Sequence, residues 1–334
     1  MSEREDVSRL QCCFASWRID RSDQNVAICD SPIRSDMGMQ LNISEDLLDG
    51  KRRFLFEDLD ARGEIVHLQG VLAEVSAIHA YPEPVQRLLG EFMAAAVLLA
   101  SNLKFEGSLT VQARSQRQIP LIMAECSSTM ALRAIARGAQ EVMEGTFSEL
   151  LGDGQLVLTI TPAKGQRYQG IVPLDGVNLA ACIDSYFAQS EQLQTKIYLS
   201  SSGRRSAGLL VQQLPPQLET NPDRRNREFE RLTVLSDTLR PEELMGLQDE
   251  ELLRRLFNED SLRLFEAEPV RFSCSCNTER TRNALATLGA AEIHDILQEQ
   301  GAITMDCEFC NQRYVFQEAD LEDLLSCDDS KTMH

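Results

Sequence analysis

Four cysteine residues near the end of the chain form two closely spaced pairs. One residue separates Cys274 from Cys276, two separate Cys307 from Cys310, and 30 residues lie between the pairs. Zinc prefers thiolate ligands in tetrahedral geometry, and two tight turns can each direct two sulfur atoms at one ion. The spacing therefore predicts one four-thiolate zinc site per chain. Because four thiolates fill the coordination shell, the pattern argues against a hydrolytic centre.

The same cysteines are also suited to thiol redox chemistry. Zinc ribbons mostly separate their paired cysteines by two to four residues, whereas only Ser275 lies between the first pair here. The second pair has the C-x-x-C spacing that lowers thiol pKa and eases oxidation. Bound zinc keeps cysteines as thiolates, the form that peroxide or hypochlorous acid attacks. Two hypotheses stay open: an inert structural ribbon, and a module that loses zinc and unfolds when oxidised.

The other cysteines and the nearby histidine fit a metal site less well. Cys126 ends an apolar stretch and Cys182 follows two alanines, so both are predicted to be small core residues. His294 lies between the two pairs, and with four thiolates present we expect it at the surface. The sequence assigns no role to the remaining cysteines, which are Cys12, Cys13, Cys29 and Cys327.

Composition indicates a soluble cytoplasmic protein. The chain has 33 basic and 52 acidic residues, and its net charge of -19 argues against nucleic acid and anionic membranes as partners. Four of the first six residues are charged, and the start lacks the basic-then-apolar pattern of a signal peptide. The longest apolar run, Phe92–Ala100, is about half as long as a membrane span. Cysteines in the cytoplasm are mostly reduced, which favours metal or redox use of the clustered ones.

The first two regions of the chain differ in pattern. Residues 1–48 are polar with little periodicity and are predicted to be a disordered extension. Residues 49–214 are predicted to form an α+β domain with a mixed sheet, a long core helix after Pro84 and a shorter helix capped by Asn178. The expected strands are 108–114, 119–125, 155–161, 168–174, 196–201 and 208–214.

Residues 215–270 are predicted to form a helical, charge-rich linker. From Asn221 to Val270, 21 of 50 residues are charged, yet leucines recur at helical spacing. Short helices of this kind depend on docking to something else. The simpler interpretation is a solvated helical linker, and the alternative is a segment that switches between docked and disordered states.

Residues 271–334 hold the paired cysteines and an acidic tail. A module of this size rarely has a sufficient hydrophobic core, so a metal would supply much of its folding free energy. Structural zinc contributes about 10–16 kcal/mol in small peptides. Loss of zinc should therefore unfold the module and then release the linker.

The chain resembles the bacterial family of 33-kilodalton redox-regulated heat-shock chaperonins over about residues 50–317. The four cysteines match the family pattern of C-x-C followed, after 27 to 32 residues, by C-x-x-C. Asn311 stands where the family usually has glycine, but asparagine also tolerates a left-handed backbone. Further similar segments are Arg167–Leu174, Tyr186–Phe187, Ser190–Leu193 and Ala207–Gln212.

The resemblance implies a chaperone and not an enzyme. Its expected activity is that of an ATP-independent holdase, inactive when reduced and zinc-bound. Oxidation would form disulfides between Cys274 and Cys276 and between Cys307 and Cys310, release zinc and favour a homodimer. The active form would bind unfolded or oxidatively damaged client proteins.

Two other classes of function fit the sequence less well than a chaperone. A zinc-ribbon nucleic-acid adaptor should carry basic residues around its cysteines, whereas Gln317–Asp329 has six acidic residues and no basic one. A thiol oxidoreductase should place its C-x-x-C at the start of a helix, whereas here a strand-like stretch, Arg313–Phe316, follows.

Overall fold

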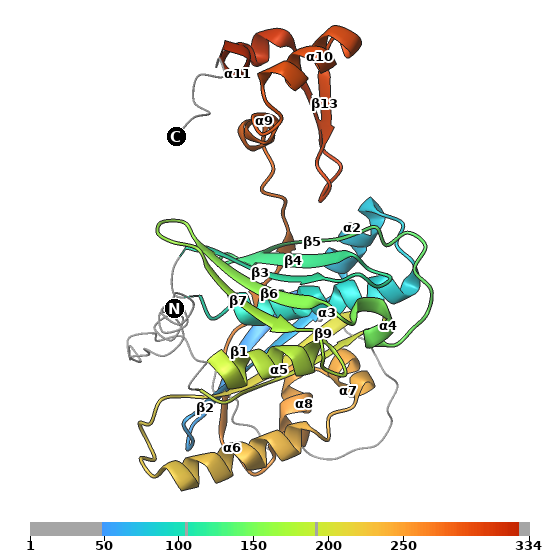
Figure 1. Ribbon diagram of the computed structural model, residues 1–334. Helices are drawn as coiled ribbons and strands as arrows, with labels where there is room; N and C mark the ends of the chain where they lie inside the picture. The colour runs from blue at the N-terminus through green and yellow to red at the C-terminus, as the bar shows by residue number, and fades with distance from the viewer. Residues whose placement is uncertain (1–48, 104–105, 191–192, 327–334) are drawn as a thin grey trace. The chain divides into compact units, whose positions relative to one another are not determined.

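A computed structural model describes residues 49–103, 106–190 and 193–326 of the chain (Figure 1). The chain divides into two compact units, with the boundary between Phe272 and Ser273. The predicted boundaries between the N-terminal extension, the α+β domain, the linker and the cysteine module, at residues 48, 214 and 270, stay predictions. The extension 1–48, with Cys12, Cys13 and Cys29, lies outside the described residues, as does Cys327.

Two six-stranded sheets form the frame of the first unit. Neighbouring strands are antiparallel except β12 (Arg271–Phe272) and β5 (Ala131–Arg137), which are parallel. Sheet A has the order β10 (Leu262–Leu264), β1 (Gly50–Phe56), β2 (Ala61–Leu68), β9 (Ser206–Gln213), β8 (Thr195–Ser201), and β11 (Glu268–Pro269) also pairs with β1. Sheet B has the order β12, β5, β4 (Leu121–Ser127), β3 (Gly107–Arg114), β6 (Gln155–Pro162), β7 (Tyr168–Pro173).

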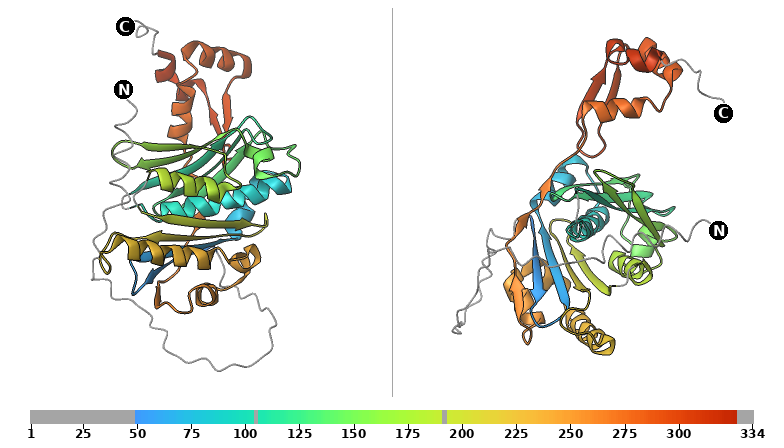
Figure 2. Two further views of the ribbon diagram at one scale, coloured as in Figure 1. Left: turned by 60° about the horizontal axis from the view of Figure 1, so that its bottom comes forward. Right: turned by 90° about the vertical axis from the view of Figure 1, so that its left-hand side faces the viewer.

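The long core helix predicted from the sequence is α3 (Glu83–Ala100). Pro82 and Pro84 set its start, because proline suits the first turn of a helix and not its interior. The helix packs against strands of both sheets and is buried on nearly every side, which matches its apolar sequence. The shorter helix α5 (Leu179–Ser190) lies in the same layer (Figure 2), and the Oδ1 atom of Asn178 accepts the Ala181 N–H at 2.8 Å, as predicted.

Three linker helices cover the face of sheet A that α3 does not contact (Figures 1 and 2). They are α6 (Pro222–Ser236), α7 (Pro241–Gly246) and α8 (Asp249–Leu256). Their apolar side chains are buried against the sheet, so the interpretation as a solvated linker is wrong. The region is mainly helical, as predicted, and two short strands that the sequence did not predict, β10 and β11, continue sheet A along β1.

The α+β class of the first unit is confirmed, but its details differ from the prediction. All six predicted strands are present as β3, β4, β6, β7, β8 and β9, each shifted by no more than two residues at its start. The sequence reasoning missed β1, β2 and β5, and it predicted one mixed sheet where the structure has two. Two further helices, α2 (Gly70–Ile78) and α4 (Phe147–Leu151), complete this unit. Within the described residues, no helix combines the length and the apolar character that crossing a membrane requires.

The second unit is a small module with a thin core. Two helices, α9 (Thr278–Leu285) and α10 (Ala290–Gln300), precede an antiparallel hairpin of β13 (Ile303–Asp306) and β14 (Arg313–Phe316). A short 3-10 turn at Glu318–Asp320 leads into α11 (Glu322–Ser326). The buried core consists of Leu285, Ile293, Leu297, Ile303, Phe316 and Leu321. The small size of this core is consistent with the expectation that the module needs a metal to fold.

Candidate metal centre and linker docking face

The first cysteine pair lies between β12 and α9. Asn277 caps α9, and its Oδ1 accepts the Arg280 N–H at 2.8 Å. Arg280 then reaches back from the first turn, and its Nη1 donates to the carbonyl oxygen and to Oγ of Ser275 at 3.0 and 2.6 Å. The helix thus fixes the single residue that separates Cys274 from Cys276.

The second cysteine pair lies at the tip of the β13–β14 hairpin. The carbonyl oxygen of Cys307 accepts the N–H groups of Cys310 at 3.3 Å and Asn311 at 2.7 Å, and the Cys307 N–H donates to Gln312 at 2.9 Å. Asn311 has a φ of 55°, so it adopts the left-handed conformation for which asparagine was expected to substitute for glycine. A hairpin tip is not the helix start that a thioredoxin-like C-x-x-C occupies, which weighs against an oxidoreductase.

The structure brings the four cysteines together in one cluster. Their Sγ atoms all lie within 4.8 Å of one another. The Cys274–Cys307 sulfur distance is 3.6 Å and the Cys276–Cys310 distance is 3.4 Å. Tetrahedral zinc with bonds of about 2.3 Å separates its ligand sulfurs by about 3.8 Å. The four sulfur atoms therefore lie close enough together to hold one metal ion.

The electrostatics of the cluster differ from one sulfur to another. Burial raises the pKa of the Cys276 thiol, but hydrogen bonds from Tyr314 and from the neighbouring thiols outweigh it and lower the pKa to about 7. Burial raises the pKa of Cys310, and its contacts with the other cysteine thiols raise it further. One sulfur therefore ionises first and opposes ionisation of its neighbours, so a cation is needed to hold all four as thiolates.

The remaining candidates lie where the sequence placed them. Cys126 and Cys182 are buried in the core of the first unit, and burial raises the pKa of each thiol, for Cys126 to about 12. Neither residue belongs to the sulfur cluster. His294 is exposed on α10, and its Nε2 lies 2.9 Å from Nε2 of Gln298.

Comparison with known proteins identifies the family. Residues 49–317 match the family model described as Hsp33 protein. The chain belongs to the Hsp33 family. The "33 kDa chaperonin" of Pseudomonas paraeruginosa is 51% identical over 281 residues, which are 83% of this chain and 95% of that protein. The protein of the same name from Azotobacter vinelandii is 52% identical over 281 residues, with the same coverage of both chains.

A solved structure shares the fold. The crystal structure of the Hsp33 homologue from Thermotoga maritima superposes with a TM-score of 0.71 at 23% identity, and covers 83% of this chain and 98% of that one. The resemblance inferred from the cysteine pattern and the similar segments is therefore confirmed. The chain is an α+β member of the Hsp33 chaperonin family.

The linker of this Hsp33-family chain covers an apolar surface on sheet A, which we call the docking face. Phe257 follows α8 and is 1% exposed; its ring meets Phe56 edge-on at a centroid distance of 5.1 Å and lies 6.2 Å from Phe54. The docking face consists of Phe54, Phe56, Ala61, Ile65, Ala207, Leu209 and Val211, and the linker residues buried on it are Phe229, Leu232, Leu244, Leu252, Leu253, Leu256 and Phe257.

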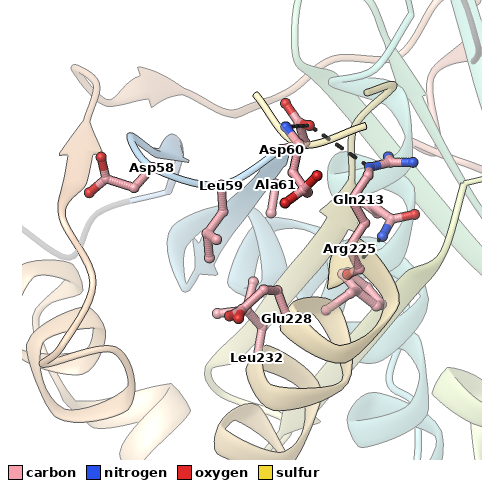
Figure 3. A pocket seen from close by; sticks show the side chains of 10 residues that line it. Asp58, Leu59, Asp60, Ala61, Gln213, Arg225, Glu228 and Leu232 are labelled. Carbon is pink, nitrogen blue, oxygen red and sulfur yellow. Dashed lines mark hydrogen bonds and ion pairs between the residues drawn. The ribbon is translucent and has the colours of Figure 1, made fainter. Parts of the chain in front are cut away.

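A buried carboxylate fixes the start of the linker (Figure 3). Asp60, in the turn between β1 and β2, accepts the backbone N–H groups of Gln217, Leu218 and Glu219 at 3.0 to 3.2 Å. Its Oδ2 also lies 3.8 Å from Nε of Arg225 on α6, as the dashed line in Figure 3 marks. We call this group of contacts the Asp60 anchor. It borders a cavity of about 40 Å³ between α6 and the sheet.

A second polar contact holds α8. Asp249, in the first turn of that helix, lies with Oδ1 3.0 Å from Nε2 of His67 on β2 and with Oδ2 3.7 Å from Nη1 of Arg52 on β1. Arg52 also binds Glu250 at 2.5 Å. Sequence reasoning missed the Asp60 anchor and this contact, because each joins residues more than 150 positions apart.

Proposed function

We propose that this chain is a redox-regulated, ATP-independent holdase chaperone. When reduced, it is inactive and holds one zinc ion through Cys274, Cys276, Cys307 and Cys310. The observation that carries the proposal is the clustering of four sulfurs in a module that follows directly on a linker docked over apolar surface. Membership of a family whose relatives are named 33 kDa chaperonin supports the chaperone class.

The switch begins with oxidation of the thiolates. When bound, zinc would keep all four sulfurs ionised and tie the first cysteine pair to the hairpin. Each pair, Cys274 with Cys276 and Cys307 with Cys310, gives two electrons to the oxidant and forms one disulfide. A disulfide sulfur is a poor ligand, so oxidation of both pairs removes the metal and with it the cross-link between the two halves of the module.

Release of the linker follows from the chain's connectivity. Cys274 comes two residues after β12, and β12 pairs with β5 only at Arg271 and Phe272. The preceding strands β11 and β10 span two and three residues. When the module no longer folds, these short pairings are the only strand contacts that hold the end of the linker within the described residues, and local openings of this kind have low free energy.

An uncovered docking face would bind clients. Its phenylalanines and aliphatic side chains are apolar, contiguous and buried by the linker in the reduced state. Exposed apolar patches of this kind bind unfolded chains or other copies of the same protein. The proposed partners are unfolded or oxidatively damaged proteins and, in the oxidised state, a second copy of this chain. The protein is proposed to act in the cytoplasm, with no enzymatic activity and no nucleic-acid or membrane partner.

The proposal is tested by measuring zinc content and suppression of aggregation together, before and after hypochlorous acid. One zinc ion per chain should leave as holdase activity appears. The variant Cys274→Ser/Cys276→Ser should lose both tight zinc binding and the oxidative switch, whereas Cys29→Ser, a cysteine with no assigned role, should behave like wild type. If zinc is retained after oxidation, or is lost without the appearance of holdase activity, the hypothesis of an inert structural ribbon would be favoured instead.

A further inference from the structure

A tyrosine outside the ligand set contacts the sulfur cluster. Tyr314 lies on β14, two residues before the buried Phe316, so both side chains are on the core-facing side of the hairpin. The Tyr314 ring is half-buried and its hydroxyl lies 3.2 Å from Sγ of Cys276. The hairpin that carries Cys307 and Cys310 therefore also holds a sulfur of the other pair.

We propose that Tyr314 is a positioning residue that orients Cys276 and lowers the reactivity of its sulfur toward electrophiles and oxidants. The inference rests on the proposed metal site. The hydroxyl donates its proton toward a sulfur that is a thiolate when it binds a metal, and hydrogen bonds to charged acceptors are the stronger ones. Such a bond withdraws charge from the lone pair that would attack an oxidant. Groups that contact metal ligands tune them in this way.

The two arginines near this contact bind other groups. Arg313 points its guanidinium at Asp306 on β13, with distances of 2.8 and 2.9 Å. Arg280 donates to Ser275. The first cysteine pair is thus held from two sides: by Arg280 through the intervening serine, and by Tyr314 through the sulfur of Cys276. The tyrosine acts on the atom that reacts, whereas the arginine acts on the backbone beside it.

The oxidation that the tyrosine slows can be written in two balanced steps with hydrogen peroxide. The Cys276 thiolate attacks one peroxide oxygen, the O–O bond breaks, hydroxide leaves, and a sulfenic acid remains on the sulfur. A second thiolate then attacks that sulfur and displaces a second hydroxide, which completes the disulfide. Two thiolates lose two electrons in total, and one peroxide becomes two hydroxide ions. A hydrogen bond from Tyr314 to the Cys276 thiolate slows the first step, because this hydrogen bond must weaken when the sulfur attacks the peroxide oxygen.

The experiment compares Tyr314→Phe with wild type in the zinc-loaded, full-length protein. Tyr168→Phe, which removes a hydroxyl from β7 in the first unit, is the matched control. Two rates are measured: alkylation of Cys276 by iodoacetamide, followed by mass spectrometry, and zinc release by hydrogen peroxide. Both should be about fivefold faster in Tyr314→Phe, equivalent to ~1 kcal/mol at 1.36 kcal/mol per tenfold. Either rate unchanged or slower would overturn the inference.

Two measurements separate this role from a structural one. Zinc transfer to a chelator without oxidant should stay within twofold of wild type, and an equal acceleration there would show that the tyrosine only supports the module. In the cobalt-substituted protein, loss of the hydrogen bond should move the sulfur-to-metal charge-transfer band to longer wavelength, and an unmoved band would contradict the contact. Neither alkylation nor the spectrum involves chaperone activity, so failure of the holdase proposal would be seen separately.

Discussion

Replacing Phe257 by alanine should release the linker without any oxidation of the cysteines. The side chain is 1% exposed and packs against the rings of Phe54 and Phe56 on the docking face. It lies outside the larger core formed around α3, which should stay folded in the variant. The change therefore weakens linker docking directly and leaves the four clustered cysteines in place.

The size of the effect follows from the burial of the ring. Truncation of a buried phenylalanine to alanine costs about 3–5 kcal/mol, which combines lost transfer energy with the cavity that remains. At about 1.4 kcal/mol per tenfold, the docking equilibrium shifts toward the open state by about two to three and a half orders of magnitude. A linker that is docked in nearly all wild-type molecules would then be open in a measurable fraction of reduced ones.

The assay combines hydrogen exchange with suppression of aggregation in the reduced, zinc-loaded protein. Amides of α6 and α8 should lose protection in Phe257→Ala while those of α3 keep it, and holdase activity should appear with zinc still bound. Val234→Ala is the control, because Val234 lies on α6 but is 58% exposed. Unchanged protection in α8 together with no activity would refute the view that apolar docking keeps the chaperone closed.

Two further predictions concern the ends of the switch. Asp60→Ala should raise hydrogen exchange at Gln217 to Glu219 and loosen the first turn of α6 by about 1–2 kcal/mol, since three N–H groups lose their acceptor; unchanged exchange there would show that the Asp60 anchor has no role. Removal of zinc by a chelator under reducing conditions should unfold the second unit, so that amides of α10 exchange freely while α3 stays protected. A metal-free module that keeps its protection would contradict the expectation that its core is too small to fold alone.

The sequence predicted those elements whose pattern is local. Helix α3 begins between Pro82 and Pro84 and carries apolar residues at helical spacing, so its type and its burial could both be inferred from residues 81–103. The four cysteines of the candidate metal site were visible for the same reason, since the spacing within each pair decides whether one turn can present two sulfurs. What spacing could not show is that the pairs meet, with sulfur contacts of 3.4 and 3.6 Å.

The missed strands β1 and β2 show why burial cannot always be inferred locally. Their sequences contain charged residues that usually mark a solvent-exposed segment, yet all eight residues of β2 are buried, including Arg62 and Glu64. One face of the strand packs on the core around α3, and the linker covers the other. The cover comes from residues about 170 to 190 positions further along the chain, so no local pattern contains this information. Strand β5 was missed because alanine, leucine and arginine favour helices, and sheet pairing overrode that preference.

The Asp60 anchor gives the linker a second property. Because the linker stays joined to β9 and is held near Arg225, it competes with any client for the docking face as a tethered ligand. Short flexible tethers produce effective concentrations of about a millimolar. A client present at micromolar concentration must therefore bind the face about a thousandfold more tightly than the opened linker does. Folded proteins would be excluded, whereas a long unfolded chain that contacts several apolar positions at once could meet this requirement, and clients would be released when the linker docks again.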